Sequence, residues 1–205
     1  MSHTSIHIHK LHPTQVTIGL TAVNERIKRL SHMTKSGLHT HIRDHHVPVV
    51  SGPEERYYII DHHHLCRALR EIGVETADFI IVDDLTHIVW PSEFWSLMES
   101  KKFVHSFGPN GEKRDLIDIP QDVMNLKNDP YRSLATFLRE QGIYSKEQTP
   151  YIEFQWADVF RGAIAADLIE SDHSKAVEQA ILLINKYPDP YKSLPGYIAI
   201  SNKHI

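Results

Sequence analysis

The chain has 205 residues, of which 41% are hydrophobic and 23% charged, and its formal net charge is −4 with its 16 histidines counted as neutral. These values are typical of a soluble globular protein, either one large domain or a compact α/β unit with a helical extension. An acidic balance argues against a dedicated duplex-DNA binder, which normally presents a basic face. The single cysteine excludes an internal disulfide. Because the start of the chain lacks a signal-peptide pattern and no apolar run could span a bilayer, we expect a cytoplasmic protein without a membrane partner.

The first part of the chain alternates short extended and helical patterns. Residues 5–10 alternate polar and apolar side chains, which predicts a strand with His7 and His9 on its exposed face. A loop should follow, and then an apolar stripe at helical spacing predicts a helix over about 22–30. Residues 31–46, rich in Gly, Ser, Thr and His, are predicted to be a mobile connector that acts as a lid.

A hairpin is predicted next, followed by a helix and one more strand. Its first strand covers residues 47–50, where Pro48 favours a sheet edge or a strand start. The partner strand covers residues 56–60. Asp61 suits the N-cap of the following helix, which Gly73 ends at the C′ position. With a further strand at 76–82, residues 1–88 should form a small mixed α/β domain.

Residues 89–205 are predicted to form a helical extension packed on that domain. Helices are expected to start at Pro91 and at Asp129-Pro130, and longer ones to cover 151–170 and 175–186. The string Asp-Pro-Tyr-Arg-Ser-Leu at 129–134 nearly recurs as Asp-Pro-Tyr-Lys-Ser-Leu at 189–194. A duplicated unit would explain this recurrence, but we favour a common helix-start signal used twice, because the flanking residues differ.

The strongest candidate site is the predicted strand-to-helix junction at residues 57–70. The first turn of this helix carries His62, His63 and His64, beside amides without intrahelical acceptors and at the positive end of the helix dipole. Such a helix start suits phosphate, and imidazole can donate to phosphate, exchange a proton or bind metal. The simpler alternative is a capped helix with solvated histidines. Cys66 is expected to be a small buried residue rather than a redox group.

The string Asp61-His62-His63-His64, with Ala68 downstream, resembles the signature of the ParB/sulfiredoxin fold, in which a helix start holds nucleotide phosphates. With Ala68 in register, Asp61, His63 and His64 match the Asp-Gly-His-His-Arg motif of ADP-dependent free serine kinases. His62 replaces the glycine of that motif, and Leu65 replaces its basic residue. Arg67 is then the nearest guanidinium. The catalytic cysteine of sulfiredoxins falls on His63, so Cys66 does not inherit its role.

The most detailed resemblance is to the subfamily of ParB-like nucleases. Their helix start reads Asp-His-His-His, and an upstream Pro-Thr-Gln-x-x-x-Gly pattern matches residues 13–19 here. Similar strings at residues 129–134 and 153–158 extend the resemblance over most of the chain. It implies an α/β (α+β) fold, with a small mixed sheet of the ParB/sulfiredoxin type and a helical C-terminal half.

The resemblance implies a nucleotide- or phosphate-binding enzyme that carries out metal-assisted phosphoryl transfer or phosphodiester hydrolysis. The expected catalytic residues are Asp61, His63 and His64. The expected nucleotide is ADP, ATP or CTP, and the residues expected to contact it are His62, Arg67, Gln15, Thr14 and Lys28. Asp61 and His63 would hold Mg²⁺, with Mn²⁺ or Zn²⁺ as alternatives.

Two features leave other functions open. Gln15, or Thr14, stands where the serine kinases have an acidic catalytic base, and an amide cannot accept that proton, so Glu25 or Asp61 would have to replace it. The alternative function is a non-catalytic, nucleotide-gated DNA- or protein-binding module of the chromosome-partition type. Nucleic acid as the partner is less favoured by the net charge, and no helix-turn-helix pattern is evident.

Overall fold

The computed structural model describes residues 4–147 and 149–198. The chain divides into two compact units. The first consists of Met1–Ile18, Val23–Gly108 and Glu112–Lys127, and the second of Gly19–Ala22, Pro109–Gly111 and Asn128–Ile205. The division at residues 88 and 89 stays a prediction about folding domains, since the first unit continues beyond it. Residues 1–3, on which the signal-peptide argument rests, lie outside the described residues.

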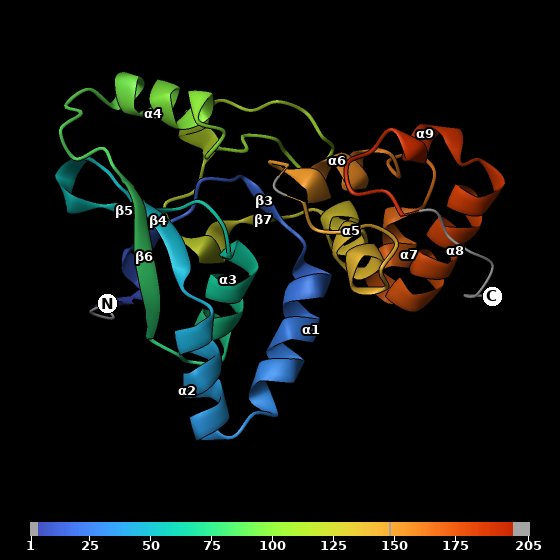
Figure 1. Cartoon of the computed structure of the whole chain (residues 1–205), viewed down its shortest axis with the longest axis horizontal. Helices are drawn as coiled ribbons and strands as arrows, with labels where there is room; N and C mark the ends of the chain where they lie inside the picture. Colours follow the sequence, from blue (N-terminus) through green and yellow to red (C-terminus); the bar gives the residue numbers. More distant parts are fainter. Residues whose placement is uncertain (1–3, 148, 199–205) are drawn as a thin grey trace. The chain divides into compact units, whose positions relative to one another are not determined.

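The first unit is built on a five-stranded mixed sheet in the order β1-β6-β4-β5-β2. Figure 1 labels β4, β5 and β6 of this sheet. β6 pairs antiparallel with β1 and parallel with β4, and β5 pairs antiparallel with β4 and parallel with β2. The strands are β1 Thr4–His7, β2 Leu11–His12, β4 Val47–Ser51, β5 Tyr57–Ile59 and β6 Thr76–Asp84. A separate short ladder pairs β3 (Thr17–Ile18) with β7 (Lys127–Asn128). The predicted mixed α/β fold is confirmed.

Both faces of the central strand β4 are buried, which explains its nearly continuous apolar sequence. Val49 and Val50 point to opposite faces of β4, and both are fully buried. Val50 belongs to a cluster with Tyr58 and with Phe94 and Met98 of α4 (Pro91–Ser100). α3 (His63–Glu71) buries Leu65, Cys66, Ala68 and Leu69. This packing anchors α3, whose first turn carries the histidines.

The structure corrects one prediction in this unit and decides between the two alternatives of another. Residues 31–46 are not only a connector, because they contain the helix α2 (Lys35–Asp44), which follows α1 (Leu20–Ser31). The Thr34 side chain caps α2 by accepting from the N–H of Gly37 at 3.1 Å, and α2 has no fully buried residue to give a sequence signal. Of the two positions predicted for Pro48, the strand start is the one found, since Pro48 is the second residue of β4 and β4 has neighbours on both sides.

Four short 3₁₀ helices complete the first unit. They are η1 Ile8–Lys10, η2 Pro53–Glu55, η3 Leu116–Asp118 and η4 Val123–Asn125. The predicted strand over residues 5–10 is therefore shorter than expected, because it turns into η1 after His7. His7 and His9 are exposed, as the alternating pattern predicts. Within the described residues, no helix combines the length and the apolar character needed to cross a bilayer.

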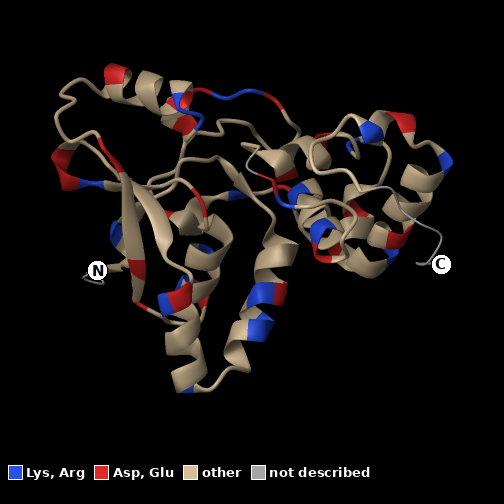
Figure 2. Cartoon of the chain, in the orientation of Figure 1, with Lys and Arg blue, Asp and Glu red and all other residues tan. Residues whose placement is uncertain are grey.

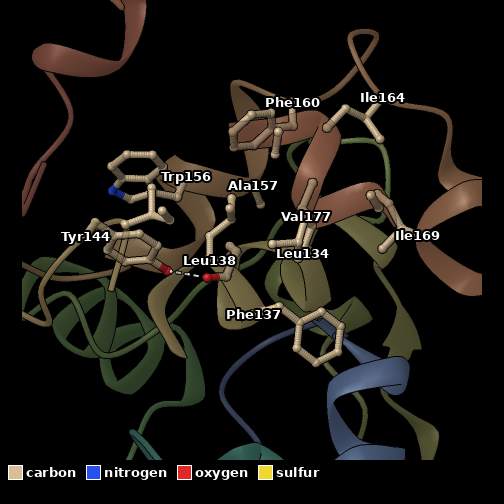
Figure 3. Close-up of a cluster of buried hydrophobic side chains, with 14 of the residues drawn as sticks. Leu134, Phe137, Leu138, Tyr144, Trp156, Ala157, Phe160, Ile164, Ile169 and Val177 are labelled. Atoms are coloured by element: carbon tan, nitrogen blue, oxygen red, sulfur yellow. Dashed lines mark hydrogen bonds between the residues drawn. The ribbon is translucent and has the colours of Figure 1, made fainter. Parts of the chain in front are cut away.

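The second unit is helical and has its own apolar core (Figure 3). Tyr144 and Trp156 stack with ring centroids 4.5 Å apart, and the hydroxyl of Tyr144 donates to the carbonyl of Ala135 at 2.7 Å. The helices are α5 Pro130–Glu140, α6 Ile152–Asp158, α7 Ala166–Ser171, α8 His173–Lys186 and α9 Asp189–Lys192. The polar indole and phenol groups are satisfied inside an otherwise apolar core.

One predicted helix of this unit is wrong. The periodic pattern at 151–170 forms two helices, α6 and α7, instead of one. Gly162 between them has φ +79°, a left-handed conformation that interrupts an α-helix. Phe160 and Ile164 are buried although they lie outside both helices. These two side chains therefore reach the core from the turn between α6 and α7.

Candidate functional site

The junction between β5 and α3 is a three-residue turn formed by residues 60–62. The N-cap of α3 is His62, which has φ 69° and ψ 20°, so the prediction of Asp61 as N-cap is wrong by one position. Asp61 is exposed, and its Oδ1 accepts a hydrogen bond from the N–H of His62 at 2.6 Å. This hydrogen bond stabilises the turn that precedes the helix. The left-handed conformation of His62 then directs the chain into the first turn of α3.

His62 adopts a backbone conformation that favours glycine. For an L-residue with a Cβ atom, this left-handed region costs about 1–2 kcal/mol. The sequence comparison with the serine-kinase motif places a glycine at this position, and the positive φ explains why glycine suits it. Retention of a strained conformation at a polar helix start is a common feature of ligand-binding turns.

The side chain of His63 is held by a hydrogen bond from the loop that follows β2. Its Nε2 accepts the backbone N–H of Thr14 at 3.1 Å, and the side chain is 6% exposed. Because a backbone N–H can only donate, Nε2 carries the lone pair and the ring proton lies on Nδ1. The hydroxyl of Thr14 in turn donates to the carbonyl of Ile59 at 2.6 Å. The structure thus brings Thr14 and His63 together, and both orient the junction.

Gln15 is buried beside this loop and makes a local contact. Its Nε2 donates to the carbonyl of Thr17 at 2.8 Å. The main chain on either side of Gln15 pairs with His105, which donates to the carbonyl of Thr14 at 2.9 Å and accepts from the N–H of Val16 at 3.3 Å. Sequence reasoning missed His105, because backbone pairing between segments 90 residues apart leaves no local pattern.

Arg67 and Lys28 are engaged with protein groups. The Arg67 guanidinium donates to Glu71 at 2.8 and 3.0 Å and to the carbonyl of Met124 at 2.6 Å, so it attaches η4 to α3. Lys28 pairs with Glu25 at 2.7 Å on the outer face of α1, and its side chain is 67% exposed. A phosphate contact by either cation stays a prediction. Glu25, the alternative base, is occupied by this ion pair.

The predicted metal ligands do not form a ready-made metal site. Among the residues that the structure describes, no three His, Cys, Asp or Glu side chains are grouped so that they could hold an ion. The Nε2 atom of His63 already accepts the amide of Thr14. Binding of Mg²⁺ would therefore depend on the exposed carboxylate of Asp61 together with oxygens of a ligand.

Cys66 has the structural role that its position predicts. It is fully buried on the packing side of α3, and burial raises the pKa of its thiol to about 12. A thiol with this pKa carries no thiolate at neutral pH, so it is not a nucleophile.

His41 of α2 and His45, the C-cap residue of this helix, form a pair that sequence reasoning missed. His41 and His45 stack with ring centroids 4.0 Å apart. Burial lowers the pKa of His41, and the charges of His45, Arg26 and His62 lower it further, whereas Asp44 raises it. The i, i+4 spacing of His41 and His45 after a Thr cap was a signal that could have identified a histidine face on a helix.

Comparisons with known proteins relate the chain to a family. The family model described as "Putative ParB-like nuclease" matches residues 4–162. The crystal structure of protein Atu1540 from Agrobacterium tumefaciens has a TM-score of 0.85 and 36% sequence identity, covering 98% of this chain and 100% of that chain. A conserved hypothetical protein from Pyrococcus furiosus, with a TM-score of 0.32 and 17% identity over 40% of this chain and 33% of that one, supports no argument. No curated protein matches.

The matched region includes both halves of the junction, the loop of Thr14 and the start of α3. It also includes α5 and α6 of the second unit, so the match is not confined to one unit. With more than half of the chain matched by the family model, and with a solved structure that is similar along its whole length, the chain belongs to the ParB-like nuclease family.

Proposed function

We propose that the start of α3 binds the phosphate of a nucleotide or another phosphorylated substrate, and that the protein catalyses phosphoryl transfer or phosphodiester hydrolysis there. The observation that carries this proposal is the strained turn at His62, which sets three consecutive imidazoles around the first turn of an anchored helix. Backbone amides and the helix dipole favour an anion at such a place. Phosphoryl transfer needs mainly positioning and stabilisation of negative charge.

The residues divide into different roles in this proposal. His64, which is partly exposed, and His62 donate to the phosphate oxygens. Asp61 is exposed beside them and orients the attacking hydroxyl or water. His63 is a positioning residue, because its Nε2 is held by Thr14. No step is assigned to a metal, since the residues present do not form a metal site by themselves.

The alternative function, a nucleotide-gated binding module, requires a surface for DNA or protein. Basic and acidic positions are interspersed along the chain in Figure 2, with no helix or strand that is basic throughout. Non-specific DNA binding depends on clustered cations that release counterions. The charge distribution therefore favours a small phosphorylated ligand.

A thermal-shift screen tests the proposal. The full chain is heated with ADP, ATP, CTP or short DNA, each with and without Mg²⁺ or Mn²⁺. A ligand at one hundred times its dissociation constant stabilises the folded state by about 2.7 kcal/mol, which is a readily measured shift. We expect a nucleotide to stabilise the wild type, and His64→Gln to reduce that shift. The absence of a shift with every ligand would contradict the proposal.

Turnover separates catalysis from binding. Phosphate or nucleotide release is measured for the wild type, Asp61→Asn and the matched control Asp189→Asn, whose side chain is 91% exposed in the second unit. We expect Asp61→Asn to bind the nucleotide but to lose at least about tenfold in turnover. Unchanged turnover in Asp61→Asn would remove Asp61 from the mechanism. Binding without any turnover in the wild type would support the binding-module alternative.

A further inference from the structure

A cavity of about 530 Å³ lies in the first unit, and none of its lining residues belongs to the start of α3. Its walls are formed by Ile6, Lys10, Ser51, Glu55, Tyr57 and Thr86. Small-molecule sites in proteins have volumes of about 300–1,000 Å³ and combine apolar walls with a few polar groups. Lys10, Glu55 and Thr86 are exposed, so a ligand can enter the cavity from solvent. The volume and the mixture of side chains are those of a small-molecule site.

The path of the chain through the sheet explains why these residues meet. β1 and β2 are the two edge strands of the five-stranded sheet, yet only the three residues of η1 connect them. A flat sheet would separate its edges by four strand spacings, about 19 Å, whereas the four Cα steps of this connection extend to about 14 Å at most. The sheet is therefore curled. The curl brings Lys10, the last residue of η1, to the same cavity as Ser51 and Tyr57.

The polar groups of this cavity are left available by the protein. In the part of the chain that the structure describes, the ammonium of Lys10 and the carboxylate of Glu55 pair neither with each other nor with another charged group. The hydroxyl of Ser51 has no hydrogen bond to a described residue, although the side chain is only 7% exposed. Water or a ligand in the cavity is therefore what these groups can contact.

Glu55 is held at the cavity by an unusual turn. Glu54 and Glu55 have φ values of 57° and 56°, so two consecutive residues with side chains adopt the left-handed conformation. Glu54 pairs with Arg56 at 2.7 Å, whereas Glu55 lines the cavity. Strained backbone of this kind is concentrated at ligand-binding sites, where the surrounding structure maintains it. The turn thus separates a paired carboxylate from one that faces the cavity.

We propose that this cavity binds a small zwitterion, a compound that carries both an ammonium and a carboxylate group. Lys10 attracts the carboxylate of such a ligand, and Glu55 attracts its ammonium. A simple anion would meet the like charge of Glu55, and a simple cation would meet that of Lys10. A ligand with both charges is attracted by both side chains, which is the chemistry of a free amino acid or a short peptide.

Ser51 and Tyr57 supply the fixed part of the site. They are paired across β4 and β5, so their side chains lie on the same face of the sheet. The ring of Tyr57 packs against that of Phe79, with the ring centroids 5.1 Å apart. The Ser51 hydroxyl donates to the ligand carboxylate, while the Tyr57 ring and Ile6 form an apolar wall for the rest of the ligand. Because the residues differ from those at α3, this site stands or falls independently of the proposed function.

The first test compares ligands on the wild-type full chain. Calorimetry measures the affinities of alanine, the dipeptide Ala-Ala, N-acetylalanine and alaninamide, of which the last two each lack one charge. We expect a zwitterion to bind about tenfold more tightly than either blocked derivative. Tighter binding of Ala-Ala than of alanine would identify a peptide site, and the reverse order an amino-acid site. A blocked derivative that binds as tightly as the zwitterions, or no binding by any probe, would overturn the proposal.

The second test assigns each charge of the ligand to one side chain. Lys10→Gln should lower the affinity for the zwitterion about tenfold and abolish its preference over alaninamide, which lacks the carboxylate. Glu55→Gln should do the same for the preference over N-acetylalanine, which lacks the ammonium. The matched control is Glu54→Gln on the same turn, which should stay within about twofold of wild type. Wild-type affinity in both cavity variants, or an equal loss in Glu54→Gln, would overturn the site.

Discussion

Asp129 and Asp61 both lie at the start of a helix, and the two aspartates have opposite environments. Asp129 caps α5, is fully buried, and receives two hydrogen bonds from the guanidinium of Arg161, at 2.6 and 3.1 Å. Asp61 precedes α3, is exposed, and accepts the N–H of His62 in the turn before the helix. The same residue type is therefore buried at one helix start and exposed at the other.

The guanidinium of Arg161 makes several further contacts at the start of α5. The guanidinium also donates to the carbonyl of Pro109 at 2.6 Å and to Asp158 at 2.7 Å, and lies over the ring of Tyr131. A charge pair with its remaining hydrogen bonds satisfied is costly to break from one side. The start of α3 has an N-cap, His62, in the left-handed conformation. This difference separates a structural helix start from a candidate binding site.

The largest effect is expected from removing the buried carboxylate. Asp129→Ala should lower the free energy of unfolding by about 3–5 kcal/mol, because it removes both the buried carboxylate that pairs with Arg161 and the cap of α5, and leaves the exposed Asp158 as the ion-pair partner of Arg161. Urea titration followed by circular dichroism measures this loss. Asp189→Ala, at the related exposed string, is the control and should change stability by less than about 0.5 kcal/mol. A small loss in Asp129→Ala would remove the contrast between the two helix starts.

The next effect concerns the histidine that positions the α3 turn. His63→Ala should lower the free energy of unfolding by about 1–3 kcal/mol, because the buried N–H of Thr14 loses its acceptor. The same titration measures it, with the exposed His39→Ala as control. An equally small loss of unfolding free energy in both variants would show that the hydrogen bond between His63 and Thr14 does not contribute to stability.

Replacement of the strained N-cap residue, His62, by glycine is expected to increase stability. His62→Gly should raise the free energy of unfolding by up to about 1 kcal/mol, because glycine adopts a positive φ without strain. His62→Ala is the matched control, since it removes the imidazole but keeps the Cβ atom, and it should not be stabilised. Stabilisation of both variants alike would mean that the ring, rather than the backbone, is the source of the strain.

The stability of the first unit should depend on pH through its partly buried histidines. Burial lowers the pKa of His12 and of His41 from the ordinary value of 6.5, so the unfolded chain binds protons more readily than the folded one. Stability should be constant above about pH 7 and fall as the pH drops through 6.5. Unfolding midpoints from pH 8 to pH 5 measure this slope, and His12→Asn should reduce it. A slope of the opposite sign would refute the assigned burial.

The smallest effect is expected at the exposed aspartate. Asp61→Asn should change the free energy of unfolding by less than about 0.5 kcal/mol, because the amide oxygen can still accept the N–H of His62. Its effect should instead be seen in turnover. A loss of stability as large as that of Asp129→Ala would show that both helix starts are structural.

Several local features were predictable because neighbouring residues decide them. The cap of α5 by Asp129 with Pro130 at its first position, and the end of α3 at Gly73 with φ +78°, follow from local backbone chemistry. The buried side of α3 follows from the spacing of Leu65, Ala68 and Leu69. These are the features that the sequence predicted correctly.

Other features depend on contacts that a local pattern does not contain. α2 presents no buried side chain, so its helical period was weak against its Gly, Ser and Thr content. The break at Gly162 is compensated by burial of Phe160 and Ile164, which made two helices resemble one. Thr14 and His63 are 49 positions apart, and the sequence could suggest both as ligands of a nucleotide but not their contact with each other.

The sequence by itself determined the strands and helices of the first unit's centre, the polar character of the α3 start and the family resemblance, because each depends on residues close together in the chain. Only the tertiary structure decided that His62 is the N-cap, that His63 is held by Thr14, and that Asp129 is buried while Asp61 is exposed. Burial and pairing across long separations depend on which surfaces meet after folding, and identical residue types therefore acquire different roles.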